Sequence, residues 1–274
     1  MSIPSLLSAH SSASLSDLSE PSIVTRLRSA GCVFAEDEAR LLLSAAPTPS
    51  ALADMVERRI AGLPLEHVVG WAEFCGLRIE VDAGVFVPRP RTEFLVAQAT
   101  ALAARPRPVV VDLCCGSGAL GAALAAALGG IELHAADIDP AAVRCARRNV
   151  TSAAGRVYEG DLYAPLPPSL RGCVDILLAN APYVPSEHIG LLPPEARDHE
   201  PRAALDGGTD GLDVQRRVTS AAAQWLAPGG HLLMETSERQ APHTAEAFTH
   251  GGLTVHLATC DDLGATVIIG TRPH

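Results

Sequence analysis

Lysine is absent from this chain of 274 residues, so every basic side chain apart from histidine is an arginine. The 21 basic residues are outnumbered by 31 acidic ones, and the formal net charge at pH 7 is −10. Non-specific binding to a phosphate backbone requires a net basic surface. The composition therefore argues against such binding as the main activity, and we expect no direct nucleic-acid partner.

Cysteine pairs, aromatic residues and long apolar runs are also scarce. The seven cysteines form no C-x-x-C pair, and the adjacent Cys114 and Cys115 fit neither a disulfide framework nor a zinc site. Aromatic residues make up only 4% of the chain, so alanine, leucine and valine must fill most of the core. No stretch approaches the roughly 20 apolar residues of a membrane span, and the serine-rich start lacks a signal-peptide pattern. These absences predict a cytoplasmic protein without membrane contact, without a metal site, and with a disordered segment over residues 1–20.

Helical periodicity dominates the next part of the chain, from Pro21 to about Gly62. It predicts a small domain of three short helices over 21–70, in which Ser50 caps the third helix. The pattern then changes to short extended pieces, Phe74 to Leu77 and Ile79 to Val81. They predict a hairpin linker over 71–91.

From residue 92 to 274, apolar β-rich runs alternate with amphipathic helical runs, which is typical of a mostly parallel sheet covered by helices on both faces. The expected elements are helix 92–104, strand 109–112, helix 119–128, strand 131–137, helix 140–149, strands 156–159 and 174–179, helix 212–226, strand 230–235, helix 240–250, and strands 253–259 and 265–270. The turn between the last two strands is too short for a crossover, so we expect an antiparallel hairpin at the sheet edge. The fold class is α/β, a seven-stranded Rossmann-like domain preceded by a small helical domain.

The first strand of this domain leads into a glycine-rich loop, Asp112 to Ala119. Gly116, Gly118 and Gly121 satisfy G-x-G-x-x-G, and Asp137 lies 21 residues after Gly116 at the end of the next strand, where a carboxylate can hold a ribose diol. The pattern also suits a tight turn that packs a strand on a helix, and Asp112 also suits a helix cap. A carboxylate at this strand end repels a pyrophosphate but tolerates a sulfonium, so Asp112 favours S-adenosylmethionine over NAD.

The fourth strand of the domain ends at Asn180-Ala181-Pro182-Tyr183. An amide nitrogen is a poor nucleophile, so an enzyme that methylates it must hold both of its hydrogens and aim it at the methyl group. The Asn180 side-chain oxygen and the Ala181 carbonyl can each accept one hydrogen, and the Tyr183 ring can lie on the planar amide. An ordinary Asn-x-Pro turn is the alternative interpretation.

Taken together, these motifs resemble the release-factor glutamine methyltransferases, the HemK/PrmC family. The resemblance rests on Asp112 to Ala119, Asp137, Gly160 to Tyr163, Asn180 to Tyr183, Val87 to Glu93, Pro64 to Gly70 and Glu200 to Leu205. It covers the chain from about residue 20 to the end, and the order of the motifs together with the Pro-Arg-Pro segment is its most specific feature.

The resemblance implies a helical domain that recognises the protein substrate, a peptide chain release factor, and a domain that transfers a methyl group from S-adenosylmethionine to a glutamine of its Gly-Gly-Gln loop. The residues that it implies for cofactor binding are Asp112, Cys114, Cys115, Gly116, Ser117, Gly118, Asp137, Asp161, Leu162 and Asn180. Those that it implies for holding the substrate glutamine are Asn180, Ala181, Pro182 and Tyr183. Arg89 and Glu93 are expected to be structural.

Two residues depart from the family pattern. Cys114 replaces a glycine, so its backbone must keep φ below zero or accept strain. Ala181 replaces a proline, which preserves the carbonyl but loses rigidity. Both departures allow a different methylated target.

Three other functions are compatible with parts of the pattern. An N6-adenine nucleic-acid methyltransferase would act on a similar flat amine, but base flipping calls for a basic surface that this chain lacks. A non-catalytic cofactor-binding scaffold and an NAD oxidoreductase are the others. Intact Asn180 and Tyr183 argue against the scaffold, and Asp112 argues against the oxidoreductase.

Overall fold

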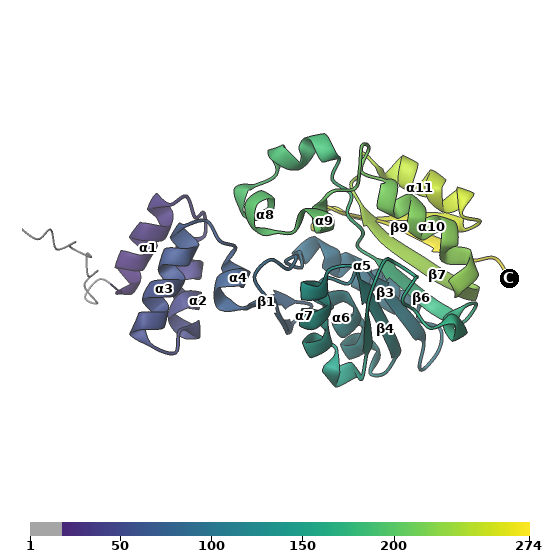
Figure 1. Cartoon of the computed structure of the whole chain (residues 1–274), viewed down its shortest axis with the longest axis horizontal. Helices are drawn as coiled ribbons and strands as arrows, with labels where there is room; N and C mark the ends of the chain where they lie inside the picture. Colours follow the sequence, from purple (N-terminus) through teal and green to yellow (C-terminus); the bar gives the residue numbers. More distant parts are fainter. Residues whose placement is uncertain (1–17) are drawn as a thin grey trace, which may run out of the picture. The chain divides into compact units, whose positions relative to one another are not determined.

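A computed structural model describes residues 18–274 of the chain (Figure 1). Of the segment 1–20 that was predicted to be disordered, positions 1–17 lie outside the described residues. The prediction was wrong at Glu20, which begins the first helix. The chain divides into two compact units at the Val69–Gly70 bond, and each unit is described by itself below. Among the described residues, no helix is long and apolar enough to cross a membrane.

The described part of the first unit, residues 18–69, contains four helices. They are α1 (Glu20–Ser29), α2 (Ala35–Ala45), α3 (Pro49–Ile60) and α4 (Leu65–Val69). Their apolar faces meet in a core that includes Ile23, Leu27 and Val56, each fully buried. A buried ion pair between Arg59 and Glu38 ties α3 to α2, with Nε to Oε2 at 2.6 Å.

The cap of α3 is Thr48, and the prediction of Ser50 was wrong. The Thr48 hydroxyl accepts a hydrogen bond from the Ala51 N–H at 3.1 Å. Pro49 then occupies the first helical position, where a missing N–H costs nothing and the fixed φ suits the helix. Ser50 is therefore already inside the first turn.

The second unit opens with a hairpin of β1 (Trp71–Phe74) and β2 (Leu77–Glu80). Its two turn residues, Cys75 and Gly76, both have positive φ, as a tight primed turn requires. The prediction of a strand from Phe74 to Leu77 was therefore wrong, because these residues span the turn. Strand β1 ends before the turn and β2 begins after it.

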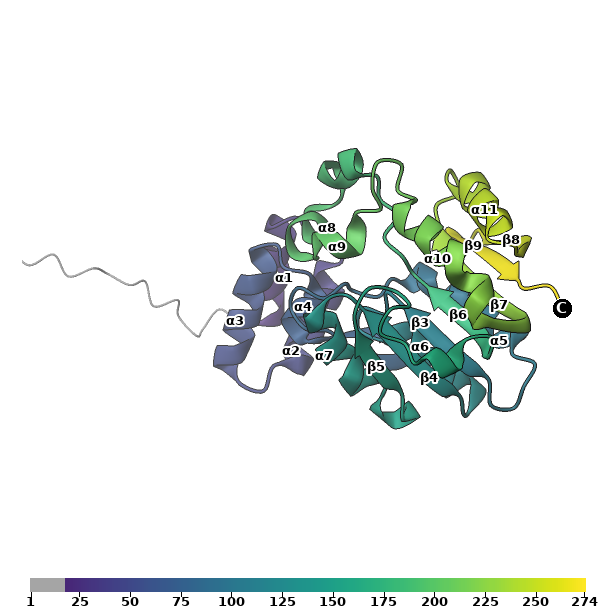
Figure 2. The ribbon, with the colours of Figure 1, turned by 45° about the vertical axis from the view of Figure 1, so that its right-hand side comes forward.

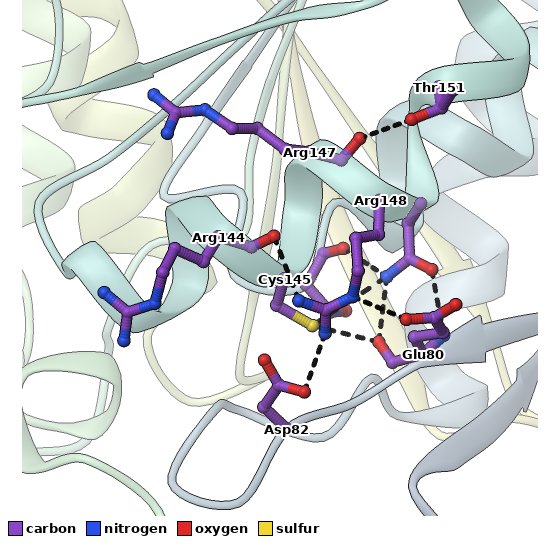
Figure 3. Close-up of polar contacts among 9 residues, drawn as sticks. Glu80, Asp82, Arg144, Cys145, Arg147, Arg148 and Thr151 are labelled. Carbon is purple, nitrogen blue, oxygen red and sulfur yellow. Dashed lines mark hydrogen bonds and ion pairs between the residues drawn. The ribbon is translucent and has the colours of Figure 1, made fainter.

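The hairpin is joined to helix α7 (Pro140–Asn149) by side-chain contacts (Figure 3). The Arg148 guanidinium donates to Glu80 at 2.5 Å and to Asp82 at 2.7 Å. The Asn149 amide pairs with the backbone of Glu80 in both directions and donates to the Ser117 carbonyl at 2.8 Å. Asn149 thus links the hairpin to the glycine-rich loop.

A seven-stranded sheet follows, in the order β5-β4-β3-β6-β7-β9-β8. The strands are β3 (Val109–Leu113), β4 (Glu132–Asp137), β5 (Arg156–Glu159), β6 (Val174–Ala179), β7 (Leu226–Thr236), β8 (Thr254–Cys260) and β9 (Ala265–Thr271). Strand β9 is antiparallel to both of its neighbours, and the pairs among β3 to β7 are parallel. The predicted fold class and the terminal hairpin at the sheet edge are confirmed.

Helices cover the two faces of the sheet in separate groups (Figures 1 and 2). Helices α5 (Glu93–Leu102), α6 (Ala119–Leu128) and α7 share one apolar core with the sheet, and α10 (Asp213–Trp225) and α11 (Ala241–His250) share the other. Within β3, Val110 faces the first core and Val111 the second, as the alternation of a strand buried on both faces requires.

Short helical segments complete the unit. They are η2 (Pro90–Thr92), η3 (Thr151–Ala153), η4 (Pro168–Leu170), η5 (Ser186–Leu191), α8 (Pro194–His199) and α9 (Arg202–Leu205). The segment from η5 to α9 follows β6 and precedes α10 in the chain. It stands away from the sheet (Figure 2). The sequence pattern did not predict these helices.

Candidate active site

A cavity of about 230 Å³ lies at the carboxyl ends of β3, β4 and β6. This is the edge at which open parallel sheets bind ligands, because polar loop residues converge there. The cavity brings together most of the residues predicted for the cofactor and the acceptor: Cys114, Cys115, Gly116, Ser117, Asp137, Asp161, Leu162, Asn180 and Pro182. Four predicted residues are outside its lining, namely Asp112, Gly118, Ala181 and Tyr183.

The glycine-rich loop between β3 and α6 forms one wall of the cavity. Gly118 has φ +78°, and a Cβ at this position would lie 3.1 Å from Ala146, so glycine permits the close approach of α6 to α7. The loop also turns through the left-handed region at Gly116 and at Cys114, where φ is +54°. Cys114 therefore has the strained backbone conformation, which was one of the two outcomes expected for a cysteine in place of a glycine.

Asp137, at the end of β4, holds the loop in place. One carboxylate oxygen accepts the Gly116 N–H at 2.8 Å, and the other accepts the Asp139 N–H at 2.9 Å. Burial raises the pKa of Asp137, and these two N–H groups oppose the shift. Each carboxylate oxygen offers two lone-pair sites, so both retain the capacity to accept a ribose hydroxyl.

Asp112 lies behind the loop and is fully buried. One of its oxygens accepts the Gly121 N–H of α6 at 3.1 Å, which is the capping contact that the sequence left as an alternative. The other oxygen has no hydrogen-bond partner among the described residues. Burial raises the pKa of Asp112 to about 7, and the nearby Asp137 adds to the shift. A cation bound in the adjacent cavity would favour the ionised form.

The charges that line the cavity are mostly negative. Asp137, Asp139 and Asp161 are the acidic lining residues, and Arg217 is the basic one. The Arg217 guanidinium donates to Asp161 at 2.5 Å, which neutralises part of that charge. Burial raises the pKa of the Cys114 and Cys115 thiols, so both stay protonated and uncharged. An acidic cavity suits a cationic ligand and repels a pyrophosphate.

The bend after β6 forms the opposite wall. Asn180 and Pro182 line the cavity, whereas the Ala181 side chain is buried, with 1% exposure. Tyr183 turns its hydroxyl into a polar cluster, where it accepts from Arg91 at 2.6 Å and lies 3.2 Å from Glu235. Asn180, Pro182 and the loop 114–118 therefore meet at one cavity.

The Pro-Arg-Pro segment lies beside this bend. Glu200 accepts from the Val87 N–H and from Arg89, and Glu93 accepts from the Cys75 N–H. Arg89 and Glu93 thus make structural contacts.

Sequence reasoning missed Arg91, Glu235 and Arg217 as members of this region. Glu235 carried a usable signal, because an acidic residue near the end of an apolar strand is costly to bury without a function or a partner. Arg91 and Arg217 carried none, since their partners lie far away in the sequence.

The fold and the acidic cavity define a class I S-adenosylmethionine-dependent methyltransferase. A family model described as "Methyltransferase small domain" matches residues 77–191. The solved structure of a methyltransferase from Pyrococcus furiosus shares the fold, with a TM-score of 0.55 and 18% identity over 73% of this chain and 90% of that one.

Sequence relatives identify the family within this class of methyltransferases. A release factor glutamine methyltransferase of Mycolicibacterium smegmatis is 41% identical over 231 residues, which span 83% of this chain and 82% of that protein. A 4-amino-L-phenylalanine/4-methylamino-L-phenylalanine methyltransferase of Streptomyces pristinaespiralis is 37% identical over 229 residues, 80% of this chain and 77% of that one. The chain belongs to the release factor glutamine methyltransferase family, as its motifs predicted.

Proposed function

We propose that this enzyme transfers a methyl group from S-adenosylmethionine to the side-chain amide nitrogen of a glutamine in the Gly-Gly-Gln loop of a peptide chain release factor. The observation that carries the proposal is the meeting of Asn180 and Pro182 with the loop 114–118 at one acidic cavity. The relatives named release factor glutamine methyltransferase support the choice of acceptor.

The residues present fit the cofactor. Loop 114–118 would surround its methionine part, with Asp112 behind the loop. Asp137 would hold the ribose hydroxyls, and Asp161 with Leu162 would border the adenine. When bound, S-adenosylmethionine supplies an electrophilic methyl group on a positively charged sulfur. The carboxylates around the cavity favour that charge, as Coulomb attraction requires.

The acceptor amide must be oriented, because its lone pair is delocalised. The Asn180 side-chain oxygen and the Ala181 carbonyl would each accept one amide hydrogen, which aims the nitrogen at the methyl group. Positioning and exclusion of water supply most of the rate, since the positive charge passes from sulfur to nitrogen in this step and no new charge is created.

Tyr183 is not a general base in this proposal. Burial raises the pKa of its hydroxyl to about 12, and Glu235 adds to the shift. The hydroxyl therefore stays protonated at neutral pH. The amide proton would leave to water after the nitrogen has become acidic.

We place the protein in the cytoplasm, where release factors act, and assign substrate recognition to the helices of residues 21–70. The segment 71–91 would serve as the linker and residues 92–274 as the catalytic domain. The acidic composition fits a protein partner better than a nucleic acid.

An arylamine is a second candidate acceptor. The Streptomyces pristinaespiralis relative is named for 4-amino-L-phenylalanine, whose aromatic amine is also flat and carries a delocalised lone pair. The same pair of acceptor oxygens would suit it.

The test is incubation with labelled cofactor and either a purified release factor or 4-aminophenylalanine, followed by mass mapping of the product. We expect the label on the glutamine of the Gly-Gly-Gln loop. Transfer to the arylamine alone would replace the proposed acceptor, and transfer to neither would contradict the proposed function.

The variant Asn180→Ala should lose at least 100-fold in turnover, because one well-placed hydrogen-bonding group is worth roughly 10²–10³-fold in comparable sites. Its cofactor affinity should stay within a few-fold. The matched control is Gln224→Ala, which removes an exposed amide on α10. Wild-type turnover in Asn180→Ala would show that the assigned role is wrong.

A further inference from the structure

The hydroxyl of Tyr183 is held at its far end by groups from two distant parts of the chain. Arg91 Nη2 donates to it at 2.6 Å, and the hydroxyl lies 3.2 Å from Glu235 Oε1, which can accept its proton. Arg91 Nε also donates to Glu235 Oε1 at 3.0 Å. The three side chains form a closed triangle of hydrogen bonds.

Glu235 anchors this triangle. It is 1% exposed and stands near the end of β7, a strand of the central sheet. Its second oxygen accepts the Thr92 hydroxyl at 2.6 Å, and Thr92 lines the cavity. Both oxygens of this buried carboxylate have hydrogen-bond partners. The side chain therefore stays in one position, because moving away from either partner would leave buried charge uncompensated.

Hydrogen bonds hold the backbone at Tyr183 and at the residue that follows it. The residues that precede Tyr183 are held less firmly. The Tyr183 carbonyl accepts from the Gln240 amide at 2.9 Å, and the next N–H, of Val184, donates to Leu205 at 3.0 Å. On the other side, only one of the two residues between Asn180 and Tyr183 is a proline. Ala181 therefore keeps a rotatable φ at the position whose carbonyl must meet the acceptor amide.

We infer that Arg91 and Glu235 are positioning residues, which hold the Tyr183 hydroxyl and thereby restrain the bend Asn180 to Tyr183 that orients the acceptor amide. This inference rests on the proposed function for its effect on turnover. It concerns residues outside the cavity lining: Arg91 and Glu235 act through Tyr183, and Glu235 also contacts the lining residue Thr92.

The inference predicts coupling between Arg91 and the bend. Arg91→Met removes both donors to the triangle while keeping an unbranched, mostly apolar stem, and we expect kcat to fall on the order of 10-fold because a small misplacement of reacting groups is costly. Cofactor affinity should change by less than about 2-fold. In a Tyr183→Phe background, where the hydroxyl is already gone, the same substitution should add less than about 2-fold to the loss.

Ala181→Pro supplies a rescue. A residue before proline is already confined to extended conformations, which proline also adopts, so the backbone at 181 is suited to the change. The added proline should restore most of the turnover lost by Arg91→Met. The matched control is Arg105→Met, which removes an arginine 66% exposed and paired to Asp175 at the opposite end of β3, and it should leave turnover unchanged.

Hydrogen exchange of the segment 180–190 provides a readout that needs no acceptor. We expect the Asn180 and Ala181 amides, which precede Tyr183 in the bend, to exchange faster in Arg91→Met and in Glu235→Gln than in the wild type, with unchanged exchange in Arg105→Met. Unchanged exchange in Arg91→Met, or an equal loss of turnover with and without the Tyr183 hydroxyl, would overturn the inference. A wild-type chain that methylates no acceptor would overturn only the proposed function, and the exchange experiment would still decide the inference.

Discussion

Cys114 is one of four non-glycine residues with positive φ in the described part of the chain. Its φ of +54° lies in the left-handed region, where a side chain costs about 1–2 kcal/mol relative to glycine. It lines the cavity, and burial keeps its thiol protonated. The strain is therefore stored at the wall of the cofactor cavity.

Replacing Cys114 with glycine should relieve this strain. We expect Cys114→Gly to stabilise the chain by about 1 kcal/mol, less than the full strain because glycine gains entropy in the unfolded state. Thermal unfolding of the chain without cofactor measures the effect.

Cys115→Gly is the control for this prediction. Cys115 is buried and is not among the non-glycine residues with positive φ, so the same change should destabilise there. Equal shifts in the two variants would contradict the strain at Cys114.

At the scale of single residues, the sequence predicted those site residues that stand at the ends of strands. Asp137 and Asn180 each stand where an apolar run ends, and strand ends of a parallel sheet meet at one edge. It did not predict the triangle of Arg91, Tyr183 and Glu235. Arg91 and Glu235 are 144 residues apart, and only the folded sheet brings them together.

Helix α7 is the element that connects the hairpin to the cofactor loop. Its last two residues, Arg148 and Asn149, both contact the hairpin, but in different surroundings. Arg148 bridges Glu80 and Asp82 at the surface (Figure 3), with side chains between 41% and 57% exposed. Asn149 instead bonds to backbone groups of Glu80 and Ser117.

These surroundings predict unequal effects. Asn149→Ala should cost about 1–3 kcal/mol, because it leaves backbone groups without partners, and it should weaken cofactor binding about 10-fold by freeing the Ser117 end of the loop. Arg148→Ala should cost less than about 1 kcal/mol, as exposed ion pairs do, and leave cofactor affinity unchanged. Chemical denaturation and cofactor titration measure both variants, and a larger effect at Arg148 would contradict this account of α7.

Elements with strong periodicity were predicted well from sequence. The helices predicted at 119–128 and 140–149 have those bounds in the structure, as does the strand at 174–179. The short helices α8 and α9 were missed because four to six residues display less than two turns of pattern. The α3 cap was misplaced by two residues because threonine and serine both cap helices and only the Pro49 position distinguishes them.

On the scale of the whole molecule, two small sets of acidic side chains have pKa values that are shifted in opposite directions. Surface carboxylates such as Asp198 and Asp210 have pKa values lowered by hydrogen bonds from arginine. Asp112 and Asp137 in the second unit have pKa values raised by burial. The surface carboxylates Asp198 and Asp210 are thus paired with arginine, whereas no ion pair to Asp112 or Asp137 is found among the described residues.

Stability should therefore depend on pH with a sign opposite to that of ordinary acid denaturation. The pKa of Asp112 is about 7 in the folded chain against an ordinary value of 3.8. Between these values the folded state keeps a proton that the unfolded state has lost, so stability falls as pH rises, by up to about 1.4 kcal/mol per pH unit. The lowered pKa values of Asp198 and Asp210 affect stability below pH 3.8, outside this window.

Asp112→Asn should remove this slope, because asparagine can accept the Gly121 N–H and is neutral at every pH. Thermal unfolding without cofactor from pH 4.5 to 8 should show the wild type losing stability relative to the variant up to about pH 7 and running parallel to it above. Burial lowers the pKa of His231, which opposes the slope near pH 6.5, but the histidine is common to both proteins and cancels in the difference. Asp139→Asn, which removes a carboxylate from the cavity lining and preserves the cap of α7, should keep the wild-type slope. Parallel curves for the wild type and Asp112→Asn over the whole range would show that Asp112 is ionised in the folded chain, and the cavity would then hold its negative charge even without a cation.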